Sequence, residues 1–273
     1  MNATERGAPW PDTMKQTQAV FFSKDPNDTA NPLAHRALKI TSAIYRKWAT
    51  YRNTSLEEWT MSWEDKAINS GIPGRGATDA WYRTALHVEL QRISGQDVSG
   101  GSIDIYKCFD QINRKLLKQI AITAGMPERI AEPHFRFIGD IEVRYQIGSK
   151  IGKARQEKCS IPQGCPFSMT MVALLMTPWV KLMRGLQVDP RVLADDLLFT
   201  AQGKHHRSSA VRAMRESRKF FSAMGARIAD NKCFTFSTEP STRTFLNELE
   251  WDGTGLKIPN VNECRDLSKP SFE

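Results

Sequence analysis

Carboxylates inside apolar, strand-like runs are the feature that most constrains this chain. Asp104 lies in the run 102–110, and Asp195 and Asp196 lie together in the run 193–199. An ionised Asp in such a strand costs several kcal/mol unless it is paired or holds a cation. Three acids of this kind, brought together by the fold, predict a metal site.

The order of the short patterns strengthens this interpretation. An adjacent Asp pair alone is also typical of a solvated turn and arises by chance. Here the segment 161–168 (IPQGCPFS) lies between the two acidic runs, and the segment 225–233 (GARIADNKC) follows them. Four short patterns in one order are hard to obtain by accident.

The ordered set resembles the motifs of reverse transcriptases. The segment around Asp104 resembles motif A of that family, D-x-x-x-x-F-D. Gln163 and Gly164 resemble motif B, residues 194–196 resemble motif C, and Lys232 resembles the lysine of motif D.

The resemblance extends upstream of the acidic runs. Residues 20–24 and 35–42 resemble the two halves of motif 1. Residues 71–80 resemble motif 2, in the form found in non-LTR retrotransposons and group II introns. In all, the resemblance covers about residues 18–270.

The family's chemistry accounts for the acids. Adding a nucleotide to a 3′ hydroxyl is an in-line phosphoryl transfer, and two Mg²⁺ ions about 4 Å apart can stabilise the attacking and leaving oxygens. Mg²⁺ prefers hard oxygen ligands, and Mn²⁺ is an alternative ion. The resemblance implies that Asp104 and Asp195 are the principal ligands and Asp196 an accessory one. The backbone carbonyl of Ile105 could add a further ligand.

The resemblance also assigns basic residues to the nucleotide. Lys24, Arg36 and Arg75 match positions that contact the triphosphate from the fingers. Lys232 matches a position near the triphosphate and is the candidate proton donor to pyrophosphate. Among 38 basic residues, however, a solvated surface charge is the ordinary alternative.

Phe109, Gln163 and Gly164 complete the expected nucleotide site. In the family, the aromatic residue at the position of Phe109 lies against the sugar and leaves no room for a 2′ hydroxyl, which favours DNA synthesis. Gln163 and Gly164 would let the backbone approach the template base, because Gly lacks a Cβ. The structural alternatives are a core aromatic for Phe109 and a simple turn for Gly164.

Alternating helices and short strands predict an α+β fold. The resemblance implies a right-hand polymerase palm, an antiparallel sheet with helices on one face, plus fingers and no complete thumb. We expect a disordered arm over residues 1–17, a fingers-like region with motifs 1 and 2 over 18–99, and a palm over 100–273 that ends before a thumb. The palm would contain motifs A to D and the start of motif E. Predicted elements are helices over 38–52, 79–92, 114–124, 166–183 and 206–224, a strand over 143–151 and a hairpin over 192–200.

The composition fits a polyanionic partner. A net charge of +8 and a pI near 9.3 indicate nucleic acid, although an ordinary basic protein has the same balance. Five cysteines without metal-ligand spacing predict reduced thiols in an intracellular, soluble protein. Ser, Thr, Pro and Lys interrupt the apolar stretch 167–183, which favours a buried helix and no membrane partner. Residues 1–12 do not resemble a signal peptide.

The sequence therefore predicts a retroelement reverse transcriptase domain whose partners are an RNA template, a DNA primer and deoxynucleotide triphosphates. One alternative is a truncated, inactive remnant that at most binds nucleic acid; the missing thumb and Leu193, in place of the usual aromatic residue, suggest it. Another is an RNA-dependent RNA polymerase, which Phe109 and Ala194 oppose. The activity of this chain alone and its oligomeric state stay open.

Overall fold

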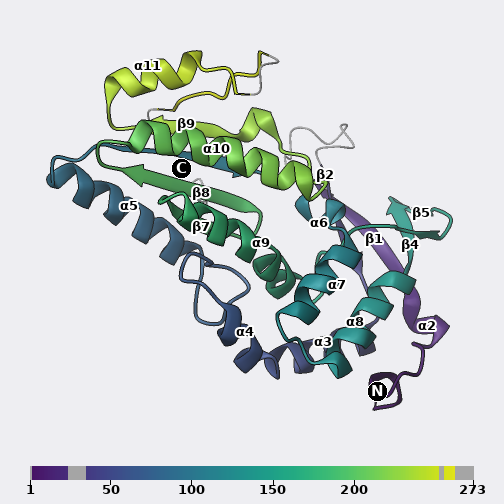
Figure 1. Ribbon diagram of the computed structural model, residues 1–273. Coiled ribbons are helices and arrows are strands. Elements are labelled where there is room, and N and C mark those ends of the chain that lie inside the picture. Colours follow the sequence, from purple (N-terminus) through teal and green to yellow (C-terminus); the bar gives the residue numbers. More distant parts are fainter. Residues whose placement is uncertain (1, 24–34, 252–254, 262–273) are drawn as a thin grey trace. The chain divides into compact units, whose positions relative to one another are not determined.

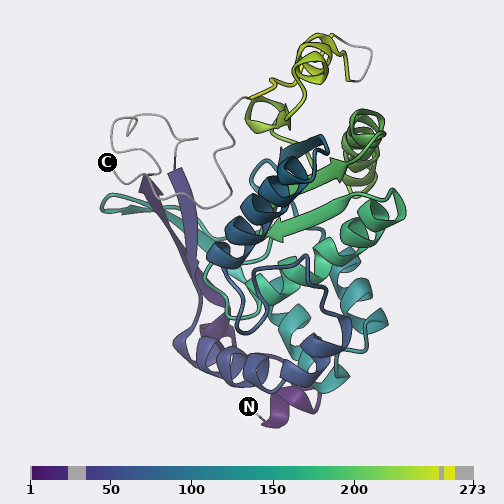
Figure 2. The same cartoon turned by 90° about the vertical axis from the view of Figure 1, so that its left-hand side faces the viewer.

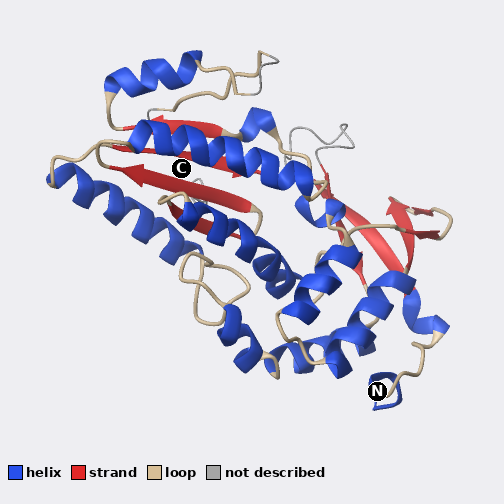
Figure 3. Ribbon diagram, viewed as in Figure 1, coloured by secondary structure: helices blue, strands red, loops and turns tan. Residues whose placement is uncertain are grey.

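The computed structural model describes residues 2–23, 35–251 and 255–261. The chain forms two compact units, each built from two stretches of sequence. The first unit is Met1–Trp63 with Phe109–Met171, and the second is Glu64–Cys108 with Val172–Glu273. Helices and strands occur in both units, which confirms the α+β prediction (Figure 3). The expected single boundary near residue 100 differs from this interleaved division.

The first unit contains a mixed sheet in the order β2-β1-β4-β5, with β6 also paired to β4. Its strands are β1 (Gln16–Ser23), β2 (His35–Ile40), β4 (Glu142–Ile147), β5 (Lys150–Ile151) and β6 (Arg155–Gln156). β2 runs antiparallel to β1 at its side, whereas β4 is parallel to β1 (Figure 2). The β1–β4 pair joins the two sequence stretches of this unit.

The helices of the first unit enclose an aromatic core. Tyr45 and Phe137 stack with ring centroids 3.4 Å apart, and Trp48 is fully buried beside Tyr45. The helices are α1 (Asn2–Glu5), α2 (Asp12–Lys15), α3 (Ala43–Thr54), α4 (Glu57–Trp63), α7 (Arg114–Thr123) and α8 (Glu128–Asp140). Two further helices, α6 (Cys108–Gln111) and α9 (Ser168–Gly185), cross from one sequence stretch to the next.

The N-terminal residues are ordered in the structure, contrary to the expectation of a disordered arm over 1–17. Trp10 is 2% exposed and its indole N–H donates to the Pro133 carbonyl oxygen at 2.8 Å. Its ring lies edge-on to Tyr45, Trp48 and Phe137. A Trp side chain buries about 150–250 Å², so one anchor of this kind can hold a polar segment that has no helical or strand periodicity of its own.

Most predicted helices are confirmed, with one exception at a boundary. The helix predicted from residue 38 begins instead at Ala43, because residues 38–40 continue β2 and pair with β1. The predicted helix over 166–183 corresponds to α9, most of whose side chains are buried. Within the described ranges, no helix combines the length and apolar character needed to span a bilayer.

The second unit contains an antiparallel sheet in the order β7-β8-β3-β9. Its strands are β3 (Val98–Asp104), β7 (Asp189–Leu193), β8 (Asp196–Gln202) and β9 (Phe234–Ser237), and its other elements are α5 (Ala77–Ile93), α10 (His206–Ala223), the 3₁₀ helix η2 (Asp230–Lys232) and α11 (Pro240–Glu248). In Figure 1, α10 lies along β3 and β8. The central strand β3 therefore has a neighbour on each edge.

Helices cover both faces of this sheet, whereas the sequence predicted helices on one face only. A Cβ at Gly101 would meet Met214 of α10 at 2.7 Å. On the other face, Val88 of α5 packs against the buried cluster of Val98, Leu198 and Phe236. Gly100 and Gly101 lie within β3, and because they lack a Cβ they allow the neighbouring elements to approach the strand closely.

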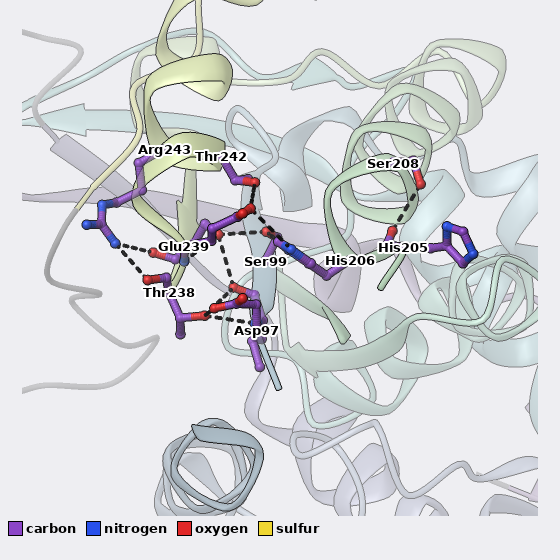
Figure 4. Close-up of polar contacts among 11 residues, drawn as sticks. Asp97, Ser99, His205, His206, Ser208, Thr238, Glu239, Thr242 and Arg243 are labelled. Atoms are coloured by element: carbon purple, nitrogen blue, oxygen red, sulfur yellow. Dashed lines mark hydrogen bonds and ion pairs between the residues drawn. The ribbon is translucent and has the colours of Figure 1, made fainter. Parts of the chain in front are cut away.

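A buried polar network joins β3 to α10 and α11 (Figure 4). The Ser99 hydroxyl hydrogen-bonds His206 Nδ1 at 2.6 Å and Ser237 Oγ at 2.9 Å, and His206 Nε2 lies 3.4 Å from Glu239. Glu239 in turn accepts from the Thr242 hydroxyl. Ser99 is fully buried, so this Ser-His-Glu arrangement links elements of the fold and offers no accessible nucleophile.

Candidate active site

Strand register brings two of the predicted carboxylates together in the second unit. Asp104, the last residue of β3, is paired directly with Asp196, the first residue of β8. Directly opposed residues of antiparallel strands have Cα atoms about 4.5–5.5 Å apart and side chains on the same face. Leu193 pairs with Asp196, so Asp195 lies in the two-residue turn between β7 and β8. The predicted hairpin is confirmed, and all three acids lie at one end of the sheet.

The turn that holds Asp195 has an unusual backbone. Ala194 has φ of +57°, a left-handed conformation that costs a residue with a Cβ about 1–2 kcal/mol. Its N–H donates to the Ser70 hydroxyl at 2.5 Å. Ser70 belongs to the loop before α5, so that loop fixes the turn on which Asp195 lies.

The three acids interact electrostatically with one another and with Lys232. Burial, together with the nearby Asp195 and Asp104 and against the lowering effect of Lys232, raises the pKa of Asp196 to about 6. Lys232 Nζ lies 3.4 Å from Asp104 Oδ2. Lys232 lies near these carboxylates, and a divalent cation bound there would neutralise further negative charge.

The segment that carries Lys232 is attached to the end of β3. Tyr106 N–H donates to the Arg227 carbonyl at 2.9 Å, and Ala229 N–H donates to the Asp104 carbonyl at 2.9 Å. These two bonds flank Ile105 and do not use its carbonyl. The backbone thus positions Lys232 and leaves the Ile105 oxygen out of this bridge.

The donor set fits Mg²⁺ in kind. Within the described residues, no group of three or more His, Cys, Asp or Glu side chains is close enough to form a metal cage by itself. Mg²⁺ does not require such a cage, because it keeps several waters and is bound through one or two carboxylates together with substrate phosphates. Asp104 and Asp195 could supply those carboxylates.

The Gln163-Gly164 pair forms a tight turn in the first unit. Cys165 N–H donates to the Pro162 carbonyl at 3.0 Å, and the Ser168 hydroxyl donates to the same oxygen at 2.7 Å. Gly164 has φ of +97°, as the third residue of a type II turn requires. The turn approaches β2, since a Cβ at Gly164 would lie 3.3 Å from Leu38 Cδ1.

Arg36 lies on the same face of β2 as Leu38, because side chains alternate along a strand. It is exposed, and the Gly164 turn packs on that face. Phe109 is half-buried, and its carbonyl accepts from Ile161 N–H at 2.9 Å. Lys24 lies outside the described residues.

Arg75 is engaged within the second unit. Its guanidinium forms a 2.6 Å ion pair with Glu64 and donates to the carbonyls of Asp65 and Ile68 at 2.7 and 3.2 Å. These contacts fold the 64–76 loop onto itself. The sequence pattern gave no sign of this partner.

Sequence reasoning missed a buried ionic cluster around Lys39. Lys39 Nζ lies 2.6 Å from Glu157, 2.5 Å from the Ser160 hydroxyl and 3.7 Å from Asp110. Burial opposes ionisation of Glu157, yet Lys39 and the Tyr145 hydroxyl hold its pKa below the usual value. The available signal was the position of Lys39, which alternation in β2 places on the face opposite Arg36.

The fold and the carboxylate cluster define a class of protein, the polymerases with a palm sheet that carries acidic residues at its end. The reverse transcriptase (RNA-dependent DNA polymerase) family matches residues 27–256. The chain belongs to this family. No curated protein sequence matches it.

Solved telomerase structures share this fold. An apo telomerase from Candida tropicalis, truncated from its C-terminal domain, superposes with a TM-score of 0.61 at 14% identity, over 85% of this chain and 51% of that one. Telomerase from the same organism, in complex with a fragment of telomeric RNA, gives 0.59 at 13% identity over 100% and 48%. The chain therefore spans about half the length of these proteins and has the palm and fingers fold of a polymerase.

Proposed function

We propose that this chain is an RNA-directed DNA polymerase domain of retroelement origin, which adds deoxynucleotides to a primer 3′ hydroxyl. The observation that carries the proposal is the pairing of Asp104 with Asp196, with Asp195 in the adjoining turn and Lys232 at 3.4 Å from Asp104. Family membership supports a polymerase. The fold's likeness to a telomerase solved with RNA supports an RNA partner.

The residues of the second unit suit nucleotidyl transfer. Asp104 and Asp195, with the Ile105 carbonyl, would hold two Mg²⁺ ions, and Mn²⁺ is an alternative. Bound there, the ions would stabilise charge on the attacking and leaving oxygens. Asp196, whose pKa is raised to about 6, is the poorer ligand and would tune the charge of the site. Lys232 would protonate the leaving pyrophosphate.

Residues of the first unit would handle the nucleotide and the template. Phe109 would lie against the sugar and exclude a 2′ hydroxyl, while Gln163 and Gly164 would offer backbone to the template base. Arg36 is exposed on the strand face that the Gly164 turn approaches, which supports a triphosphate contact. Lys24 is assigned by resemblance to the same role.

For Arg75 the structure supplies a competing partner. A triphosphate contact would require the guanidinium to leave Glu64, at 2.6 Å. The KM for deoxynucleotides, measured for Arg36→Ala and Arg75→Ala, shows which of the two residues contacts the triphosphate. We expect a raised KM for Arg36→Ala. A raised KM for Arg75→Ala as well would show that the ion pair of Arg75 with Glu64 opens when the nucleotide binds.

Primer extension tests the proposal. The purified chain, given poly(rA) with an oligo(dT) primer, dTTP and Mg²⁺ or Mn²⁺, should extend the primer. Asp195→Asn should abolish extension because it removes a ligand charge without changing size, whereas binding of the RNA–DNA duplex should persist. The matched control is Asp12→Asn, whose carboxylate is 97% exposed and far along the chain from the site.

The outcomes separate the candidate functions. Retained extension by Asp195→Asn would exclude its ligand role. Duplex binding without extension by the unmodified chain would favour the inactive remnant. A preference for ribonucleotides would favour an RNA polymerase.

A further inference from the structure

The outer surface of α3 in the first unit forms an open groove of about 930 Å³. Arg46, Lys47, Thr50 and Tyr51 line it along the helix, and Pro166 lines it from the segment after the Gly164 turn. The opposite side of α3 carries Tyr45 and Trp48 into the aromatic core. The groove therefore lies on a helix whose inner face is fixed by packing.

The groove is positively charged. Arg46 and Lys47 are exposed, and no described carboxylate forms an ion pair with either. By contrast, Arg52 of the same helix is paired with Glu5 at 2.6 Å. No Asp or Glu is among the described residues that line the groove. Two cations on one helix face, with no described carboxylate paired to either, are complementary to phosphates.

The groove also contains an exposed aromatic ring. Tyr51 is 69% exposed, and the Arg52 guanidinium lies 5.3 Å from its ring centroid. A cation beside the ring restrains its orientation at little cost in exposure. Exposed cations beside an exposed ring are the combination that binds single-stranded nucleic acid, in which bases stack on aromatics and phosphates contact the basic side chains.

The position of the groove indicates which strand it would hold. Pro166 lies two residues after Gly164, whose turn packs against Leu38 of β2. β2 ends at Ile40 and α3 begins at Ala43. Within this unit, then, the groove begins beside the turn at which the template base is expected.

We propose that the α3 groove binds the single-stranded RNA template ahead of the polymerisation site. Phosphates contact Arg46 and Lys47, and one base stacks on Tyr51. The assignment of the strand as template rests on the proposed function, whereas binding of single-stranded RNA to the groove does not.

Equilibrium binding without nucleotides tests this inference. The probes are an RNA–DNA primer duplex with a 5′ RNA overhang of about eight nucleotides, within the range that single-strand sites cover, and the same duplex with a blunt end. Fluorescence anisotropy at several salt concentrations gives the affinity and its salt slope. The unmodified chain should bind the overhang probe more tightly than the blunt probe.

Two groove variants should reduce that difference. For the overhang probe, Arg46→Gln/Lys47→Gln should lower the salt slope by about 1.4, at about 0.7 per lost contact to a single strand. Tyr51→Ala should weaken overhang binding about tenfold. The control Lys115→Gln/Arg129→Gln removes the same charge from exposed positions of α7 and α8 outside the groove and should leave the difference unchanged.

Other outcomes overturn the inference. Equal losses of affinity for the blunt and overhang probes would show that Arg46 and Lys47 contact the duplex and not the single strand. Unchanged overhang binding in both groove variants would assign the groove to another occupant, such as an acidic protein segment or a second copy of the chain. Because no nucleotide is added, these results do not depend on primer extension, so failure of the proposed function and failure of the groove are distinguishable.

Discussion

At the scale of single residues, His134 is a neutral base inside the aromatic core of the first unit. Its Nδ1 hydrogen-bonds the Tyr45 hydroxyl at 2.8 Å, and its other ring nitrogen is buried without a hydrogen-bond partner among the described residues. Burial lowers its pKa from 6.5 to about 3. The folded protein therefore contains an imidazole that cannot take up a proton at mildly acidic pH.

This histidine should make the fold sensitive to acid. Below pH 6.5 the unfolded chain protonates His134 while the folded chain does not until about pH 3. The stability that this difference contributes is present above pH 6.5 and is lost as the pH falls towards 3. His134→Gln should flatten the dependence of unfolding free energy on pH in this window by up to about 1.4 kcal/mol per pH unit. Urea denaturation at a series of pH values measures it, and parallel curves for the two proteins would contradict the prediction.

At the scale of elements, β3 is the strand on which the site depends. It is paired on both edges and covered on both faces, and it ends at Asp104. A Cβ at Gly100 would overlap the Phe199 carbonyl oxygen and lie 2.5 Å from a Phe236 ring carbon. Glycine is therefore required by the approach of β8 and β9 to this strand and not by a turn.

Gly100→Ala should thus destabilise the second unit. Overpacking of an enclosed site costs about 1–3 kcal/mol, and a shift of β3 would also move Asp104. The matched control is Gly139→Ala in α8, where a Cβ meets nothing within 4 Å; alanine in a helix should there stabilise by up to about 1 kcal/mol. Chemical denaturation of both variants measures the difference. An equal change in the free energy of unfolding for the two variants would show that β8 and β9 move to accommodate the added methyl group.

At the scale of the whole molecule, the residues assigned to catalysis are divided between the two units. The carboxylates and Lys232 belong to the second unit, while Phe109, Gln163 and Gly164 belong to the first. Both units are assembled from separated stretches of chain. We therefore expect a substitution in the first unit to change catalysis even when the fold of the second unit, which contains the carboxylates, is intact.

Sugar selection tests this division of roles. If Phe109 lies against the 2′ position, Phe109→Val should raise the use of ribonucleotides relative to deoxynucleotides about tenfold or more, because a ring in a close-packed site cannot easily relax. The control is Phe220→Val, the same change at a half-buried position of α10. The ratio of kcat/KM for the two nucleotide types is the measurement. Unchanged discrimination with intact polymerisation would return Phe109 to a packing role.

Local sequence accounts for much of the fold and of the candidate site. The helical patterns predicted α5, α7 and α10 closely, and the strand-like acidic runs predicted β3 and the β7–β8 hairpin. The turn observed at Gly164 was the structural alternative that the local sequence left open. These features depend on residues a few positions apart, so their physical causes can be read from the chain itself. Trp10 was missed because one buried aromatic ring leaves no periodic pattern.

Tertiary structure decided which side chains meet. The sequence gives the order of Asp104, Asp195, Asp196 and Lys232 along the chain. It is the register of β3 against β8 that places Asp104 opposite Asp196. The backbone bridge at the end of β3 brings Lys232 close to Asp104. The folding of the 64–76 loop brings Arg75 into its ion pair with Glu64. Such pairings join distant stretches of chain, and packing of whole elements selects them, so no local pattern contains them.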